Sequence, residues 1–105
     1  MPVQLHDVPR HGKIDKTDFT LKWKRPGENG APITKYKVYQ RTVNENGEEM
    51  SWRDIDSTPG LEYHVSNLER GKIYEFKVTA TNRIGEGKED KRYFKTVKVK
   101  AGKSS

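Results

Sequence analysis

Two separated stretches of this chain, residues 19–38 and residues 68–85, alternate apolar and polar side chains with a period of two. That period places every second side chain on one face, the pattern of half-buried β-strands. In the second stretch Tyr74 comes six residues after Leu68, across a turn that contains Gly71. A tyrosine at the start of a strand can bury its ring and return its hydroxyl to upstream backbone, the corner device of Greek-key sandwiches. The pattern therefore predicts an all-β chain.

Turn signals divide the chain into segments that predict a seven-stranded antiparallel Greek-key β-sandwich. The expected strands lie within residues 3–8, 18–24, 33–43, 51–56, 61–66, 72–81 and 91–99, and residues 10–17 are expected to be a polar connection. Pro2 and Pro9 bound the first segment and predict an edge strand, because proline is tolerated only at strand edges or ends. In the last segment Phe94 has the opposite parity to Val97 and Val99, so we expect a bulge near Phe94.

The length of 105 residues predicts a single domain, residues 1–105, with a core over about residues 2–99 and a flexible tail or linker at 100–105. Only 30% of the residues are hydrophobic and 34% are charged, a balance that can indicate disorder. The aromatic residues nevertheless fall mostly at alternating positions, which suits a thin sandwich core. We expect that core to form around Trp23, Tyr36, Leu68 and Tyr74.

Residue types that perform chemistry are few and scattered. The absence of cysteine excludes a disulfide, a cysteine-based zinc site and a thiol nucleophile. His64 has no histidine or cysteine partner at a metal-ligand spacing. Asp54 and Asp56 are expected on one face of a short exposed strand, where carboxylates are more often solvated than catalytic. We therefore expect no catalytic residue, no metal site and no cofactor.

The stretch from Asn44 to Glu49 offers oxygen ligands and a glycine, but it lacks the twelve-residue calcium-loop pattern. It is interpreted instead as a hairpin turn, in which Asn46 and Gly47 can take positive φ angles. No apolar run reaches the roughly 20 residues that a membrane helix needs. We expect the chain to be part of a longer protein.

The sequence marks, taken together and in order, resemble a fibronectin type III domain over about residues 2–99. They are Trp23 and Pro26, the run Ile33-Thr-Lys-Tyr36, Trp52, Leu68 with Tyr74, and the run Ala80-Thr-Asn-Arg-Ile-Gly-Glu-Gly87. The resemblance implies an immunoglobulin-like β-sandwich of the kind found in tandem arrays with immunoglobulin domains. It also implies a non-catalytic interaction or spacer module of an extracellular adhesion or receptor protein, which contacts other proteins and neighbouring domains. The alternative is a cytoplasmic module of a muscle-type array.

The net charge of +6 is concentrated near the C-terminus. Residues 88–103 hold seven lysines or arginines against two acids and so carry +5. Such a stripe can attract sulfated glycan, nucleic acid or anionic lipid, or it can simply protect a solvated edge strand. We expect no nucleic-acid binding, because only Tyr39 offers a stacking platform. The candidate ligand-binding basic face consists of Lys35, Lys37, Tyr39, Arg41, Lys77, Lys91, Arg92 and Lys95.

Overall fold

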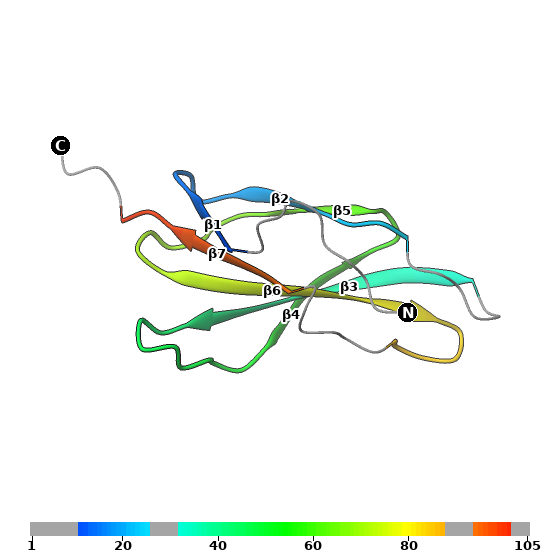
Figure 1. Cartoon of the computed structure of the whole chain (residues 1–105). Coiled ribbons are helices and arrows are strands. Elements are labelled where there is room, and N and C mark those ends of the chain that lie inside the picture. Colours follow the sequence, from blue (N-terminus) through cyan, green and yellow to red (C-terminus); the bar gives the residue numbers. More distant parts are fainter. Residues whose placement is uncertain (1–10, 26–31, 88–93, 102–105) are drawn as a thin grey trace.

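The computed structural model describes residues 11–25, 32–87 and 94–101, and these residues form strands and no helix. The strands are β1 (His11–Ile14), β2 (Phe19–Lys22), β3 (Ile33–Val43), β4 (Arg53–Thr58), β5 (Glu62–Val65), β6 (Ile73–Asn82) and β7 (Lys95–Val99). They form a five-stranded sheet of order β1-β7-β6-β3-β4 and a two-stranded sheet of order β2-β5. Figure 1 shows the two sheets as the two layers of a sandwich. The predicted all-β Greek-key architecture is therefore confirmed.

The core lies between the two sheets and contains the residues placed there from the alternation. Trp23 and Tyr36 are 2% and 1% exposed, and their ring centroids lie 5.6 Å apart. Tyr74 is also buried, and its hydroxyl accepts a hydrogen bond from the backbone N–H of Glu69 at 2.8 Å. This bond forms the tyrosine corner and fixes the turn that leads into β6. The buried core cluster is Leu21, Trp23, Tyr36, Val38, Val65, Leu68, Tyr74, Phe76, Val78, Val97 and Val99.

The N-terminal part differs from the prediction. The strand expected at residues 3–8 lies outside the described residues. The expected polar connection at 10–17 contains β1, which pairs in parallel with β7 from His11 opposite Thr96 to Ile14 opposite Val99. The sandwich is thus not entirely antiparallel. The sequence of this segment shows no alternation of apolar residues that would predict a strand. It becomes a strand by hydrogen bonding along the otherwise open edge of β7.

The bulge expected near Phe94 is not needed. β6 and β7 pair in regular register from Ile73 opposite Lys98 to Phe76 opposite Lys95. Phe94 precedes β7 and is 6% exposed, with its ring 5.3 Å from that of Trp52. Phe94 and the valines of β7 are all buried, but on opposite faces of the sheet. Val97 and Val99 face the sandwich core, and Phe94 is on the face that points away from it.

Asp54 and Asp56 do not share a face, contrary to the expectation. A register shift in the β3–β4 pair places Asp56 opposite the buried Val38 and Asp54 opposite Tyr39. The extra residue of a bulge reverses the alternation between them. The hairpin turn before β4 is confirmed, since the N–H of Gly47 donates to the Asn44 carbonyl at 2.8 Å. Gly47 has the expected positive φ, 85°, whereas Asn46 does not.

Candidate functional site

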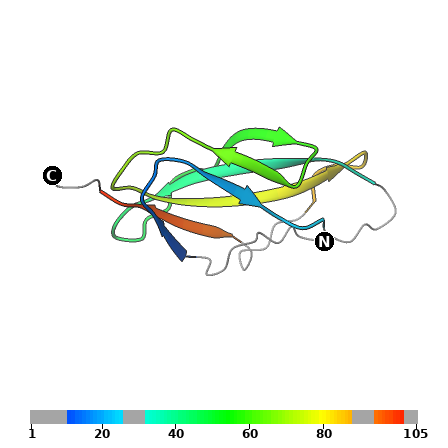
Figure 2. The same ribbon diagram turned by 90° about the horizontal axis from the view of Figure 1, so that it is seen from above.

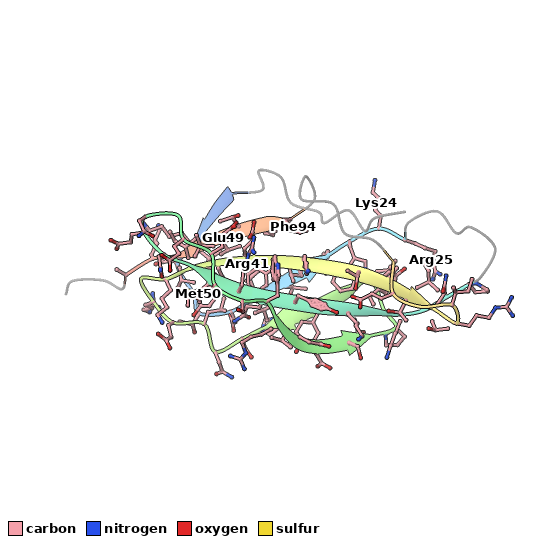
Figure 3. The ribbon with its side chains drawn as sticks, turned by 90° about the horizontal axis from the view of Figure 1, so that it is seen from below. Lys24, Arg25, Arg41, Glu49, Met50 and Phe94 are labelled. Atoms are coloured by element: carbon pink, nitrogen blue, oxygen red, sulfur yellow. The ribbon has the colours of Figure 1, made fainter. Side chains whose placement is uncertain are left out.

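The predicted basic face corresponds to the outer face of the five-stranded sheet, the side that points away from β2 and β5. Long antiparallel pairing of β3 with β6 brings its residues together, with Tyr39 opposite Lys77 and Arg41 opposite Glu75. Paired residues on neighbouring strands project to the same side. Figure 3 views this face and shows Arg41 and Glu49 near Phe94.

Lys77 is buried on the outer face, with only 8% of its surface exposed. Its Nζ lies 4.8 Å from the centroid of the Tyr39 ring and 4.6 Å from that of Trp52. Aromatic faces carry negative partial charge and stabilise a cation that has lost water. Lys77 is therefore a cation buried against two aromatic rings on the outer face of the sheet.

Trp52 covers a small cluster on the outer face of the sheet, the outer-face cluster. Its other members are Tyr39, Arg41, Lys77 and Phe94. Trp52 precedes β4, rather than lying in a strand as expected, and its half-buried ring contacts Phe94 edge to face. The guanidinium of Arg41 stacks on the same ring, 4.1 Å from the centroid. The sheet consequently has an aromatic and cationic layer on its outer side in addition to the apolar core on its inner side.

Carboxylates pair with two of the cations of the outer face, Arg41 and Lys37. The Arg41 Nε donates to Glu75 at 2.6 Å, and its Nη2 donates to Glu49 at 2.8 Å. Lys37 forms a longer ion pair with Asp54, with 3.8 Å between Nζ and Oδ2. These pairs link β3 to β6, to β4 and to the connection between β3 and β4, and they reduce the positive potential that the sequence suggested.

Glu86 connects the β6–β7 loop to the sheet. One of its carboxylate oxygens accepts hydrogen bonds from the Tyr39 hydroxyl, at 2.7 Å, and from the Thr79 hydroxyl. Partial burial raises the pKa of Glu86, but these two hydrogen bonds and the charges of Lys37 and Lys77 outweigh it and hold the pKa below its usual range. Burial and the bond to Glu86 together raise the pKa of Tyr39.

The remaining residues of the predicted face are dispersed. Lys35 is exposed on β3, opposite Thr81. Lys95 pairs with Phe76, and its Nζ lies 5.7 Å from the Phe19 ring of β2, so it is directed toward the inner side of the sheet. Lys91 and Arg92 lie outside the described residues.

The sequence did not predict that Glu49, Glu75 and Glu86 accept hydrogen bonds on the outer face. It also did not predict that Trp52 and Phe94 pack against each other on that face. The position of Glu75 could have been predicted by aligning β3 with β6, because Arg41 lies opposite Glu75 in that pairing. Glu86 gives no such signal, since its position depends on how the β6–β7 loop folds back.

Histidine chemistry is also limited in the described part of the chain. His64 lies 3.1 Å from the Thr20 hydroxyl and 3.4 Å from Asp18, but it is exposed on the outer side of the two-stranded sheet. Asp56 is directed toward β5, where burial and its hydrogen bond raise the pKa of Tyr63. Residues 11–25, 32–87 and 94–101 contain no cluster of three metal-ligating side chains. They also contain no helix long and apolar enough to cross a membrane.

Comparison with known proteins agrees with this architecture. The model of the fibronectin type III domain matches residues 6–96. The cell adhesion molecule Dscam2 of Drosophila melanogaster is 39% identical over 70 residues, which cover 65% of this chain and 3% of that protein. The titin homolog of Caenorhabditis elegans is 32% identical over 88 residues, which cover 80% of this chain and a share of that protein that rounds to 0%.

Among solved structures, the twitchin kinase region of C. elegans superposes with a TM-score of 0.69 at 26% identity, covering 84% of this chain and 15% of that one. The chain spans less than a tenth of the length of the curated relatives that it matches. Because the family model covers most of the sequence, this chain belongs to the fibronectin type III domain family.

Proposed function

We propose that this chain is a non-catalytic interaction and spacer module in the extracellular part of a larger adhesion or receptor protein. The observation that carries the proposal is the parallel pairing of β1 with β7. Parallel strands run in the same direction, so the described chain enters the sheet at one end of this pair and leaves it at the other. A module with this path can be placed in a linear series of domains.

The outer face supports a structural rather than a chemical role. Its buried lysine is covered by two aromatic rings, and its arginine is held by two carboxylates. Groups fixed in this way rigidify a surface, but they are not available as acids, bases or nucleophiles. Similarity to a cell adhesion molecule favours the extracellular assignment.

A cytoplasmic, muscle-type array is the second candidate, favoured by the similarity to a titin homolog and to the twitchin kinase region. An antibody raised against the folded module separates the two when applied to cells that express the full-length parent protein. Staining of intact cells supports the extracellular module. Staining that appears only after permeabilisation overturns it and supports the cytoplasmic one.

Binding of a sulfated glycan is a further candidate for the same module, favoured by the exposed Lys35 and Lys98 on the outer face. Heparin affinity chromatography of the double variant Lys35→Glu/Lys98→Glu tests it. The matched control is Lys22→Glu/Lys24→Glu, which makes the same change of charge at and just after β2. Earlier elution of the first variant alone supports a site on the outer face. Equal shifts of both variants indicate only a general charge effect.

A further inference from the structure

We infer that the outer face of the two-stranded sheet binds a divalent transition-metal ion, Zn²⁺, with His64 and Asp18 as its two protein ligands. Figure 2 shows β2 and β5 side by side on the side of the molecule that faces the viewer. Their pairing places Thr20 opposite His64, and the neighbouring Leu21 and Val65 are buried in the core. Asp18 directly precedes β2 and has the parity of Thr20. Because side chains alternate along a strand, all three polar side chains project from the outer face.

The separation of the two proposed ligands fits a shared metal ion better than a hydrogen bond. The Nε2 atom of His64 and the Oδ2 atom of Asp18 are 3.4 Å apart. Hydrogen bonds from N–H to oxygen span about 2.7–3.2 Å between heavy atoms. Tetrahedral zinc bonds of about 2.0–2.1 Å to nitrogen and about 2.0–2.2 Å to oxygen separate two ligand atoms by roughly 3.3–3.5 Å. The two atoms are therefore spaced as ligands of one Zn²⁺ ion.

Thr20 orients the imidazole ring for this role. Its hydroxyl oxygen lies 3.1 Å from Nδ1 of His64, the ring nitrogen that does not face Asp18. A histidine that binds a metal through one nitrogen is usually held by a hydrogen bond at the other nitrogen, which fixes its tautomer and its direction. When the Thr20 hydroxyl accepts from the Nδ1–H group, the free lone pair is on Nε2 and faces the carboxylate. A cation between the two groups stabilises that arrangement.

The surroundings of the pair favour a transition metal that keeps part of its water shell. The His64 and Asp18 side chains are 57% and 45% exposed, so an ion can reach them and retain water in its two remaining positions. Imidazole suits Zn²⁺, whereas Ca²⁺ and Mg²⁺ prefer oxygen ligands alone. Lys22 also projects from this face, but it lies opposite Glu62, which opposes its charge.

The expectation of no metal site rested on the spacing of ligands along the chain, and spacing cannot reveal a pair that forms across two strands. Two protein ligands are fewer than the three or four of a catalytic or structural zinc site, so we expect weaker binding than in those sites. The site does not depend on the proposed function, because both ligands belong to the folded module and are present in an extracellular or a cytoplasmic parent.

Titration of the folded chain with Zn²⁺, followed by NMR of the histidine rings, tests the site. The ring signals of His64, assigned from their loss in His64→Gln, should shift to saturation at lower Zn²⁺ concentrations than those of His6 and His11. Ca²⁺ at the same concentrations should not shift them. A response of His64 that is equal to that of the other two histidines, or no saturable response, would overturn the site.

Two substitutions and a matched control separate coordination from a general effect of charge. Asp18→Asn should weaken the apparent affinity at His64 about tenfold or more, and Thr20→Val should weaken it by a smaller factor. Asp54→Asn makes the same change of charge on the other sheet and should leave the affinity within about twofold of the wild type. Equal losses in Asp18→Asn and Asp54→Asn, or no loss in Asp18→Asn, would show that Asp18 is not a ligand and overturn the site.

Discussion

Replacing Trp52 with alanine removes the cover of the outer-face cluster without touching the core between the sheets. The edge-to-face contact with Phe94, at 5.3 Å between centroids, contributes about 0.5–1.5 kcal/mol. The cation contacts of Arg41 and Lys77 with the same ring contribute about 0.5–1 kcal/mol each. We therefore expect Trp52→Ala to reduce the free energy of unfolding by about 2–3 kcal/mol. This corresponds to a fall in Tm of roughly 10–20 °C for a domain of this size.

Urea unfolding followed by circular dichroism measures this change, with Leu61→Ala as the control. Leu61 is 40% exposed, and its truncation should change the free energy of unfolding by about 0.5 kcal/mol or less. A double-mutant cycle with Phe94→Ala should give a coupling of about 0.5–1.5 kcal/mol for the aromatic pair. The reasoning fails if Trp52→Ala unfolds within about 0.5 kcal/mol of the wild type, or if the two substitutions are additive.

Four other perturbations test the remaining elements. Tyr74→Phe removes the acceptor of the Glu69 N–H and should lower the free energy of unfolding by about 0.5–3 kcal/mol in urea melts; an unchanged midpoint would eliminate the corner as a stabilising element. Trp23→Ala should lose about 3–5 kcal/mol by the same measurement, since the side chain is 2% exposed. Gly47→Ala should lose about 1 kcal/mol through the backbone alone, because φ is 85° and the space around the glycine is open; thermal melting checks this. Glu86 has a lowered pKa in the folded state, so its stabilisation is present above the unfolded pKa of about 4.3 and is lost as the pH falls through the folded pKa. Urea melts from about pH 6 to about pH 3 should show a steeper loss for the wild type than for Glu86→Gln, and parallel curves would contradict the role of this carboxylate.

The central strands show why part of the fold could be predicted. β3 extends from Ile33 to Val43, the range expected from its alternation and from the turn signals on either side. β6 was displaced from its expected range by only one residue at each end. Both strands lie in the middle of the sheet and present one face to the core, so burial imposes the period of two directly on the sequence.

β1 shows why another part could not be predicted. Its single apolar residue, Ile14, produces no alternation, and its strand conformation depends on hydrogen bonds to β7, more than 80 residues later in the chain. An edge accepts almost any extended backbone, because hydrogen bonding to it does not depend on side chains. Only the folded sheet reveals that this segment becomes the partner of the last strand.

The candidate site also has one part that could be predicted from the sequence and one part that could not. The sequence by itself determined that Lys37, Tyr39 and Arg41 lie on one face of a strand, since adjacent side chains of a strand alternate. Only the tertiary structure decided that Lys37 and Arg41 are paired with carboxylates. Glu49 comes from a hairpin eight residues from Arg41, and Glu75 comes from β6, 34 residues from Arg41. Glu86, which accepts from the Tyr39 hydroxyl, comes from a loop 47 residues from Tyr39. Periodicity assigns a side chain to a face, but the charge of that face depends on which distant groups the fold brings within a few ångströms, where Coulomb attraction and hydrogen bonding act.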